Sequence, residues 1–176
     1  MAPIPIPAAI VTGGAGFVGA GIVRMLQSRH PECKITVLDL EIPVAADTTS
    51  EEIDHRFIPG VAYERVDVTD QRSISDLIST IKPTLVIHSA GIIPSVPLLL
   101  QKDPQKQDLF EKVKLEGTRN VLDASEAAGV RAFVYTSSAD VVKGDSWEDQ
   151  NGVNEDTPYP ESWDNLYAKS KVRHTL

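Results

Sequence analysis

The chain is short of cysteine and of long apolar runs, and each shortage excludes a class of protein. Cys33 is the only cysteine in 176 residues, so no internal disulfide can form and a reducing compartment such as the cytoplasm is favoured. No apolar stretch approaches the roughly 20 residues that a membrane span needs. The start carries no basic segment and is interrupted by Pro3, Pro5 and Pro7, which is not typical of a secretory signal.

Basic residues are also scarce, with 17 Lys and Arg against 25 Asp and Glu and a formal net charge of -8. Binding to nucleic acid requires clustered Lys and Arg, and no cluster stands out, so nucleic acid is excluded as a main partner. His30, His55 and His174 have no Cys or Asp at the spacing of a metal site, and the acidic residues between 145 and 156 are interpreted as a solvated loop. No metal is therefore predicted.

What the sequence does contain is an alternation of strand-like and helix-like segments. This alternation predicts an α/β Rossmann-type domain over residues 1–176, with a doubly wound parallel sheet of about five strands in the order 3-2-1-4-5. Pro83 ends the second helix and Gly129 caps the third. The expected strands are 8–12, 34–39, 61–66, 84–88 and 132–136, the expected helices 17–29, 73–81, 107–128 and 165–176, and the main loops 42–60, 92–104 and 143–164. Within the first helix, apolar residues recur at helical spacing at Val18, Ile22, Met25 and Leu26.

The first motif is a glycine-rich turn between the first strand and the first helix. Residues 12–19 read TGGAGFVG, a TGxxGxxG pattern in the strand–turn–helix context that dinucleotide binding requires. Gly13 permits the tight turn, Gly16 lets the backbone approach a pyrophosphate, and Gly19 lets the helix pack close to the sheet. The helix N-terminus offers N–H groups and a positive dipole to phosphates. The alternative interpretation is a plain turn.

The second feature is Asp39, at the end of the second strand and 20 residues beyond Gly19. A carboxylate there can accept hydrogen bonds from the ribose hydroxyls of adenosine, and it would repel a 2'-phosphate. It therefore favours NAD over NADP. The alternatives are a capping or solvated aspartate, and Glu41 as its substitute.

The third feature combines a YxxxK pattern, Tyr167 and Lys171, with Ser138 after the fifth strand. Residues four apart share a helix face, so the Lys171 ammonium can lower the pKa of the Tyr167 phenol. A phenolate can take a proton from an alcohol while hydride leaves for a nicotinamide. Ser138 can hydrogen-bond the reacting oxygen, and Ser137 is its local alternative.

Taken together, these residues resemble the extended short-chain dehydrogenases, especially the 3β-hydroxysteroid dehydrogenase group and, within it, the fungal-type sterol-4α-carboxylate 3-dehydrogenases. The resemblance covers nearly the whole chain. It is carried by VTGGAGFVG at 11–19, VLDL at 37–40, VDVTD at 66–70, HSAG at 88–91, GTRNVLDASEAAGV at 117–130, FVYTSSADV at 133–141 and YAKSK at 167–171.

The resemblance implies an NAD-dependent oxidoreductase that oxidises a secondary alcohol on a sterol-like or other lipophilic substrate, with Tyr167 as the base assisted by Lys171 and Ser138. It implies a location in the cytoplasm or at the surface of the endoplasmic reticulum, and a homodimer formed through helices 107–128 and 165–176. His88 is interpreted as a packed structural histidine. The implied cofactor-binding residues are Gly13, Gly16, Phe17, Val18, Gly19, Asp39, Asp67, Val68, Ala90, Gly91, Tyr167 and Lys171.

Two departures from the family leave other functions open. Lys114 stands where the family usually has an asparagine that is associated with a helix distortion and a proton relay, and the chain stops five residues after Lys171, without the family's C-terminal substrate region. The alternatives are a secondary-metabolism dehydrogenase, a sugar-nucleotide dehydrogenase or epimerase, and a truncated nucleotide-binding remnant with little or no catalysis.

Overall fold

The computed structural model describes residues 5–43, 56–92, 104–142, 152–163 and 166–172. The chain divides into two compact units, the first formed by Met1–Gly91 with Gly117–Thr136 and the second by Ile92–Glu116 with Ser137–Leu176. The predicted loops 42–60, 92–104 and 143–164 lie partly outside the described residues.

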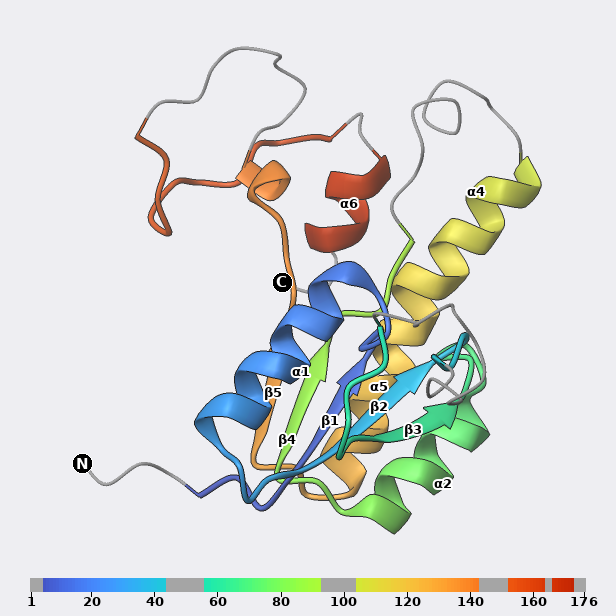
Figure 1. Ribbon diagram of the computed structural model, residues 1–176. Helices are drawn as coiled ribbons and strands as arrows, with labels where there is room; N and C mark the ends of the chain where they lie inside the picture. The colour runs from blue at the N-terminus through green and yellow to red at the C-terminus, as the bar shows by residue number, and fades with distance from the viewer. Residues whose placement is uncertain (1–4, 44–55, 93–103, 143–151, 164–165, 173–176) are drawn as a thin grey trace, which may run out of the picture. The chain divides into compact units, whose positions relative to one another are not determined.

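The first unit is built around one parallel sheet (Figure 1). Its strands run in the order β3-β2-β1-β4-β5, which confirms the predicted Rossmann-type order. β1 and β2 have the predicted bounds, whereas the other three are shorter by one or two residues. The strands are β1 (Ala8–Thr12), β2 (Lys34–Asp39), β3 (Ala62–Arg65), β4 (Leu85–His88) and β5 (Ala132–Tyr135).

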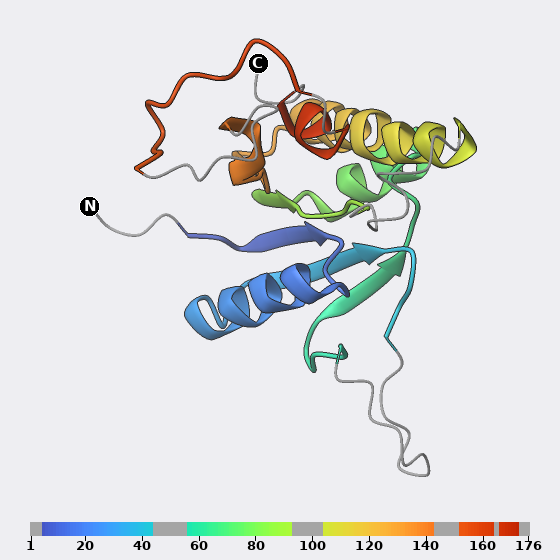
Figure 2. The ribbon, with the colours of Figure 1, turned by 90° about the horizontal axis from the view of Figure 1, so that it is seen from above.

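Helices cover both faces of this sheet. In Figure 2, α1 (Phe17–Arg29) lies on one face, and α2 (Gln71–Ile81) and α5 (Gly117–Ala127) lie on the other. This arrangement follows from the parallel connections, since right-handed crossovers return each helix to a defined face. The buried core on the α1 face includes Val11, Val23, Val37 and Ile87.

Two of the four apolar residues that recur at helical spacing along α1, Ile22 and Leu26, pack against the core. Val18 and Met25 are 57% and 53% exposed, and Ile22 and Leu26 are half-buried. The buried residues of α1 are Gly19, Ala20 and Val23. Small residues let the helix backbone approach its neighbours closely, so the largest side chains are displaced to the rim of the contact.

Helix ends largely follow the sequence signals. α2 begins two residues earlier than predicted because the Asp70 side chain caps it, with Oδ1 accepting a hydrogen bond from the Ser73 N–H at 3.1 Å. This bonding to Ser73 lowers the pKa of Asp70. α2 ends at Lys82, which is left-handed (φ 51°) just before Pro83. Gly129 follows α5 with φ 69°, as expected of a glycine C-cap.

The single helix predicted over 107–128 is wrong in its start and in its regularity. It begins earlier, as α4 (Pro104–Glu111), passes through a π-helical turn η1 (Lys112–Glu116), and continues as α5. A π-turn places one extra residue in the helix, and such turns occur frequently at functional sites. Apolar spacing does not reveal it, because one turn is too short to shift the pattern.

The second unit contains α4, η1, a 3₁₀ turn η2 (Ala139–Val142) and α6 (Leu166–Val172). α6 packs against both η1 and η2. The Trp163 indole N–H donates to the carbonyl oxygen of Val141 at 2.8 Å, which ties the segment before α6 to η2. None of the helices in the described part of the chain combines the length and apolar character that a membrane crossing requires.

Candidate functional site

The glycine-rich turn joins β1 to α1 in the first unit. Gly13 has φ 69°, a left-handed conformation that favours glycine. A Cβ atom at Gly13 would lie 2.7 Å from both the Cα and the backbone nitrogen of Ala90. Gly13 therefore serves two needs, the turn itself and close contact with the loop that follows β4.

Gly19 is required by the turn rather than by the sheet. A Cβ atom there would overlap the carbonyl oxygen of Gly13 and lie 2.7 Å from the Cα of Gly14. The sequence predicted that this glycine lets the helix pack close to the sheet, but the close approach is to the glycine turn. Gly14 is equally confined, since its Cβ would lie 2.7 Å from a methyl group of Val37.

Gly16 differs from these glycines because the protein leaves space around it. It is exposed, and a Cβ atom would meet only the carbonyl oxygen of Gly13, at 3.3 Å. Gly16 is also the N-cap of α1, and no side chain within the described residues caps that end. The first N–H groups of a helix are orphan donors with a positive dipole, so this position can hold an anionic group such as a phosphate.

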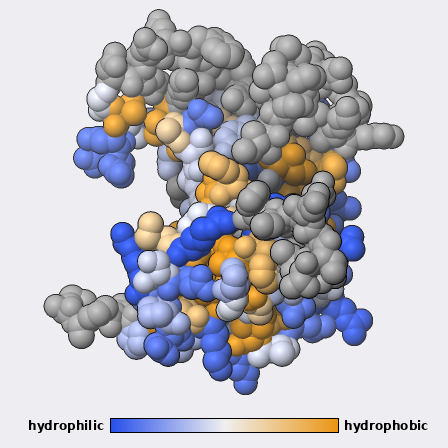
Figure 3. Space-filling model, in the orientation of Figure 1, coloured by the Kyte–Doolittle hydropathy of each residue, from blue (hydrophilic) through white to orange (hydrophobic). Residues whose placement is uncertain are grey.

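Phe17 and Val18 start α1 with unusually exposed apolar side chains, at 99% and 57%. Val18 also borders an open apolar groove together with Met25 and Ile87. Figure 3 shows hydrophobic surface among hydrophilic side chains on this face of the first unit. An exposed aromatic ring beside the glycine turn suits contact with a bound organic group.

Asp39 lies at the same turn. Its Oδ2 atom accepts a hydrogen bond from the N–H of Ala15 at 3.0 Å, and its Oδ1 atom lies 3.4 Å from the N–H of Glu41. A carboxylate has about four acceptor positions, so these bonds leave capacity for hydroxyl donors. Glu41, the alternative, instead pairs with Arg56 at 3.1 Å, an exposed ion pair.

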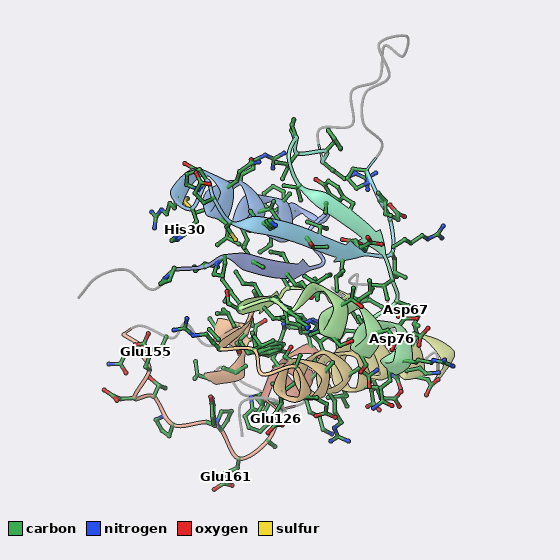
Figure 4. The ribbon with its side chains drawn as sticks, turned by 90° about the horizontal axis from the view of Figure 1, so that it is seen from below. His30, Asp67, Asp76, Glu126, Glu155 and Glu161 are labelled. Carbon is green, nitrogen blue, oxygen red and sulfur yellow. The ribbon has the colours of Figure 1, made fainter. Side chains whose placement is uncertain are left out.

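The loop after β3 carries Asp67 and Val68. Asp67 is exposed, as Figure 4 shows, and its Oδ1 atom accepts a hydrogen bond from the N–H of Thr69 at 2.9 Å. Asn120 of α5 donates to the carbonyl oxygens of Val68 and Thr69 at 3.0 and 3.2 Å. A Cβ at Gly117 would lie 2.7 Å from a Val68 methyl group. Asn120 and Gly117 hold this loop, a role that the sequence did not indicate because the partners are about 50 residues apart.

A buried chain of hydrogen-bonded polar side chains connects β1, β4 and α5. His88 is 0% exposed, with Nδ1 2.7 Å from the hydroxyl of Thr12 and Nε2 3.0 Å from that of Thr118. The N–H of Ala90 donates to the Thr12 hydroxyl at 3.3 Å. His88 is thus packed, as predicted, and the chain fixes the loop of Ala90 and the exposed Gly91 next to the glycine turn.

In the second unit, Ser138 starts the turn η2. Its Oγ atom accepts a hydrogen bond from the N–H of Asp140 at 3.2 Å, so Ser138 caps η2 and is half-buried, whereas Ser137 is exposed. The cap gives Ser138 a structural role and a fixed position, while its hydroxyl proton remains available for donation.

Tyr167 and Lys171 lie on α6, where the Lys171 Nζ atom is 5.9 Å from the centroid of the Tyr167 ring. Lys171 is 4% exposed, and burial lowers the pKa of its ammonium. Tyr167 is half-buried. At this distance from the ring, the Lys171 amine is within the range of a cation–π contact with Tyr167.

Lys114 joins this group from η1. It is 3% exposed, and its Nζ atom lies 4.6 Å from the Tyr167 ring centroid and 5.9 Å from that of Phe110. Burial first, and then the charge of Lys171 and a hydrogen bond with it, lower the pKa of Lys114 to about 7. The sequence marked Lys114 as a departure from a family pattern but did not place it at Tyr167.

No group of three or more metal-ligating side chains occurs in the part of the chain that is described. Glu155 and Glu161, from the acidic loop, are exposed and point outward in Figure 4. The residues suited to a nucleotide lie in the first unit, and Ser138, Tyr167 and Lys171 lie in the second.

The sequence matches proteins of known activity over almost its whole length. A model of the 3-beta hydroxysteroid dehydrogenase/isomerase family matches residues 10–174. Sterol-4-alpha-carboxylate 3-dehydrogenase, decarboxylating, of Candida albicans is 29% identical over 93% of this chain and 43% of its own length. 3 beta-hydroxysteroid dehydrogenase type 7 of Mus musculus is 35% identical over 97% of this chain and 43% of its own length. The chain therefore spans less than half the length of these curated relatives.

Solved structures share the fold. UDP-glucose 4-epimerase of Thermus thermophilus, in complex with NAD, is 30% identical, with a TM-score of 0.73 over 96% of this chain and 48% of that one. The Bordetella bronchiseptica enzyme WbmH, in complex with NAD+, is 22% identical, with a TM-score of 0.71 over 96% of this chain and 50% of that one. At the latter identity the likeness concerns the fold alone.

Proposed function

Because this chain belongs to the 3-beta hydroxysteroid dehydrogenase/isomerase family, we propose that it is the nucleotide-binding and proton-transfer part of an NAD-dependent dehydrogenase. Its reaction is the oxidation of a secondary alcohol on a sterol-like or other lipophilic substrate. The observation that carries the proposal is the bond between the Asp39 carboxylate and the Ala15 N–H, because it unites an acidic strand end with a glycine turn that has open space at Gly16.

The residues of the first unit fit NAD. The uncapped N-terminus of α1 and the space at Gly16 suit the pyrophosphate, and the free acceptor positions of Asp39 suit the adenosine ribose hydroxyls. Asp67, Val68, Ala90, Gly91, Phe17 and Val18 are proposed to border the rest of the dinucleotide. A 2'-phosphate would meet the negative charge of Asp39, so NAD is proposed in preference to NADP.

When bound, NAD would supply the acceptor for the hydride that leaves the alcohol carbon. Tyr167, as the phenolate, takes the hydroxyl proton, and the Lys171 ammonium stabilises that phenolate. The Ser138 Oγ atom accepts the hydrogen bond from the Asp140 N–H through a lone pair. This bond does not use the hydroxyl proton, which Ser138 is proposed to donate to the reacting oxygen.

The curated relatives support the substrate class. Both are named for oxidation of a hydroxyl group on a sterol or steroid, and one is named for a carboxylate next to it. We extend a lipophilic alcohol substrate to this chain on that basis. The same proposal includes a cytoplasmic location, which for a sterol enzyme would be the surface of the endoplasmic reticulum. It also includes a homodimer.

A sugar-nucleotide reaction is the second candidate, supported by the 30% identity to the UDP-glucose epimerase. The family match favours the steroid reaction over it. A turnover assay separates the two: a steroid 3β-alcohol or its 4-carboxylate should give NADH, whereas conversion of a UDP-hexose without NADH would support the epimerase. A chain that binds NAD but turns over neither substrate would instead be a nucleotide-binding remnant.

Calorimetric titration with NAD and NADP tests the nucleotide assignment. The chain should bind NAD more tightly, and Asp39→Ala should narrow the difference. Gly16→Val should abolish NAD binding while circular dichroism shows much of the fold retained, because the side chain occupies the exposed position at the turn and its Cβ atom meets only the carbonyl oxygen of Gly13, at 3.3 Å. Equal affinity for the two cofactors would overturn the role of Asp39.

The proton-transfer assignment is tested by Tyr167→Phe, which keeps the ring and removes the ionisable hydroxyl. Any dehydrogenase activity should fall by about 10²–10⁴-fold. Activity within a few-fold of the unaltered chain would exclude Tyr167 as the base.

A further inference from the structure

Two buried lysines meet beside Tyr167 in the second unit. Lys114 comes from the π-helical turn η1 and Lys171 from α6, and their exposed fractions are 3% and 4%. The Nζ atom of Lys114 lies 4.6 Å from the centroid of the tyrosine ring, closer than the 5.9 Å of Lys171. Both amines thus lie against one ring, and each lysine affects the pKa of the other.

A hydrogen bond between two lysines constrains where the protons are. An ammonium group has three donors and no acceptor, so two ammonium groups cannot bond to each other. One partner must be a neutral amine, and both burial and the repulsion of like charges favour the loss of one proton. Burial and the charge of Lys171 bring the pKa of Lys114 to about 7. Burial also lowers the pKa of Lys171, but its bond to Lys114 acts in the opposite direction, so Lys171 is the donor.

We propose that Lys114 is a positioning residue, whose neutral amine accepts a hydrogen bond from the Lys171 ammonium and holds that ammonium against the ring of Tyr167. This inference rests on the proposed function only in assigning Tyr167 as the base. The lysine pair itself is a property of the ligand-free chain.

Among the described residues, α6 and α4 contribute the side chains that are known to lie against Lys114. α6 contributes the two titratable groups that face it, Tyr167 and Lys171, and α4 contributes the ring of Phe110. The turn η2, packed against α6, carries the half-buried Asp140, whose N–H is bound by Ser138. In acid, Lys114 becomes an ammonium, loses its ability to accept, and repels Lys171. The arrangement is therefore expected to hold above about pH 7 and to open below it.

The first experiment titrates the lysine side chains of the ligand-free chain by NMR with isotope-labelled lysine. One side chain should lose its proton near pH 7, far below the others, and its signal should be missing in Lys114→Met. Lys112→Met, which removes an exposed lysine of the same turn, serves as the matched control and should leave that signal unchanged. If every lysine titrates near the ordinary value of about 10 in the folded chain, the neutral amine does not exist and the proposal is overturned.

The second experiment measures the ionisation of Tyr167 by ultraviolet difference absorbance, with Tyr167→Phe subtracted to remove the other tyrosines. Lys114→Gln keeps a neutral acceptor of similar length, and Lys114→Met keeps the length without an acceptor. We expect Lys114→Gln to ionise Tyr167 at the same pH as the unaltered chain, and Lys114→Met to require a pH about one unit higher, because Lys171 is no longer held. Lys114→Arg places a permanent cation there.

These variants separate the outcomes. The proposal is supported if Tyr167 ionises at the same pH in the unaltered chain and in Lys114→Gln. If Tyr167 ionises at the same pH in the unaltered chain and in Lys114→Arg, Lys114 stays charged. If Tyr167 ionises at the same pH in the Met and Gln variants, Lys114 merely fills space. Either result overturns the proposal. If Lys114→Met does not fold, the lysine titration of the unaltered chain still decides. Failure to bind NAD or to turn over a steroid would refute the proposed function while leaving these measurements interpretable.

Discussion

The two units differ in the titratable side chains that they bury. In the first unit, His88 lies fully buried between the hydroxyl groups of Thr12 and Thr118, with short hydrogen bonds on both ring nitrogens. In the second unit, the buried polar groups at Tyr167 are two amines, Lys114 and Lys171. Buried groups that are hydrogen-bonded on every side fix a position at little cost, whereas buried amines oppose folding unless one loses its proton. The buried polar groups of the first unit thus fix a position, whereas in the second unit stability depends on the protonation state of the buried amines.

The largest effect should come from filling the glycine turn of the first unit. Gly19→Ala puts a methyl group into the carbonyl oxygen of Gly13, and backbone cannot move aside cheaply, so we expect a loss of more than about 4 kcal/mol of unfolding free energy. Gly21→Ala is the matched control on the same helix, with nothing within 4 Å of the new methyl group. It should stabilise the chain by about 0.5–1 kcal/mol. Urea unfolding measures both, and similar values for the two would show that the turn is not tightly packed.

An intermediate effect, with the opposite sign, should come from the second unit. The pKa of Lys114 falls from 10.5 to about 7 on folding, so the unfolded chain binds more protons between these values and stability rises with pH across that window. Lys114→Met removes this penalty and should stabilise the chain at or below pH 7 by on the order of 3 kcal/mol, less as the pH approaches 10.

Thermal unfolding at several pH values measures the effect of Lys114→Met. The exposed Lys169→Met, on α6, controls for general loss of charge and should show no comparable pH dependence. If Lys114→Met stabilises the chain equally at every pH, the gain comes from packing and not from removal of the buried amine.

The smallest of the three effects should come from the buried hydrogen bonds of His88 in the first unit. Thr118→Val keeps the shape of the side chain but removes the hydroxyl group that lies 3.0 Å from Nε2 of His88. We expect a loss of about 1–2 kcal/mol, the usual cost of weakening the hydrogen bonding of a buried polar group. Thr69→Val, in a half-buried loop position, is a comparison that should cost less. A loss above that of Gly19→Ala would reverse the ranking of the two features.

The sequence predicted the first unit better than the second. β1, α1 and β2 have the predicted bounds because glycines and β-branched runs mark them locally. The apolar spacing of α1 identified Leu26, which packs against the core, but it also included the exposed Met25 and missed the small buried residue Ala20. Asn120 was missed because its partners, the carbonyl oxygens of the loop after β3, are backbone atoms that leave no side-chain pattern.

In the second unit the limits are different. Tyr167 and Lys171 are four residues apart on one helix, so their proximity could be predicted from spacing alone. The contact of Lys114 with them joins segments more than 50 residues apart and depends on the π-helical turn. A single sequence carries no periodic signal for such a turn. The bond of Asp39 to Ala15 likewise required the structure, although the strand-end position of Asp39 did not.

Among the described residues, β3 and β5 are the outer strands of the sheet, which has a practical consequence for handling this chain. β3 reads AYER and ends on two charges of opposite sign, whereas β5 reads AFVY, has no charged residue, and leaves Val134 47% exposed. Charge on an edge strand discourages unwanted strand addition, so aggregation at high concentration is expected to begin at β5. Light scattering as a function of concentration should therefore respond to Val134→Lys, which improves colloidal stability at the vulnerable edge without touching either candidate site.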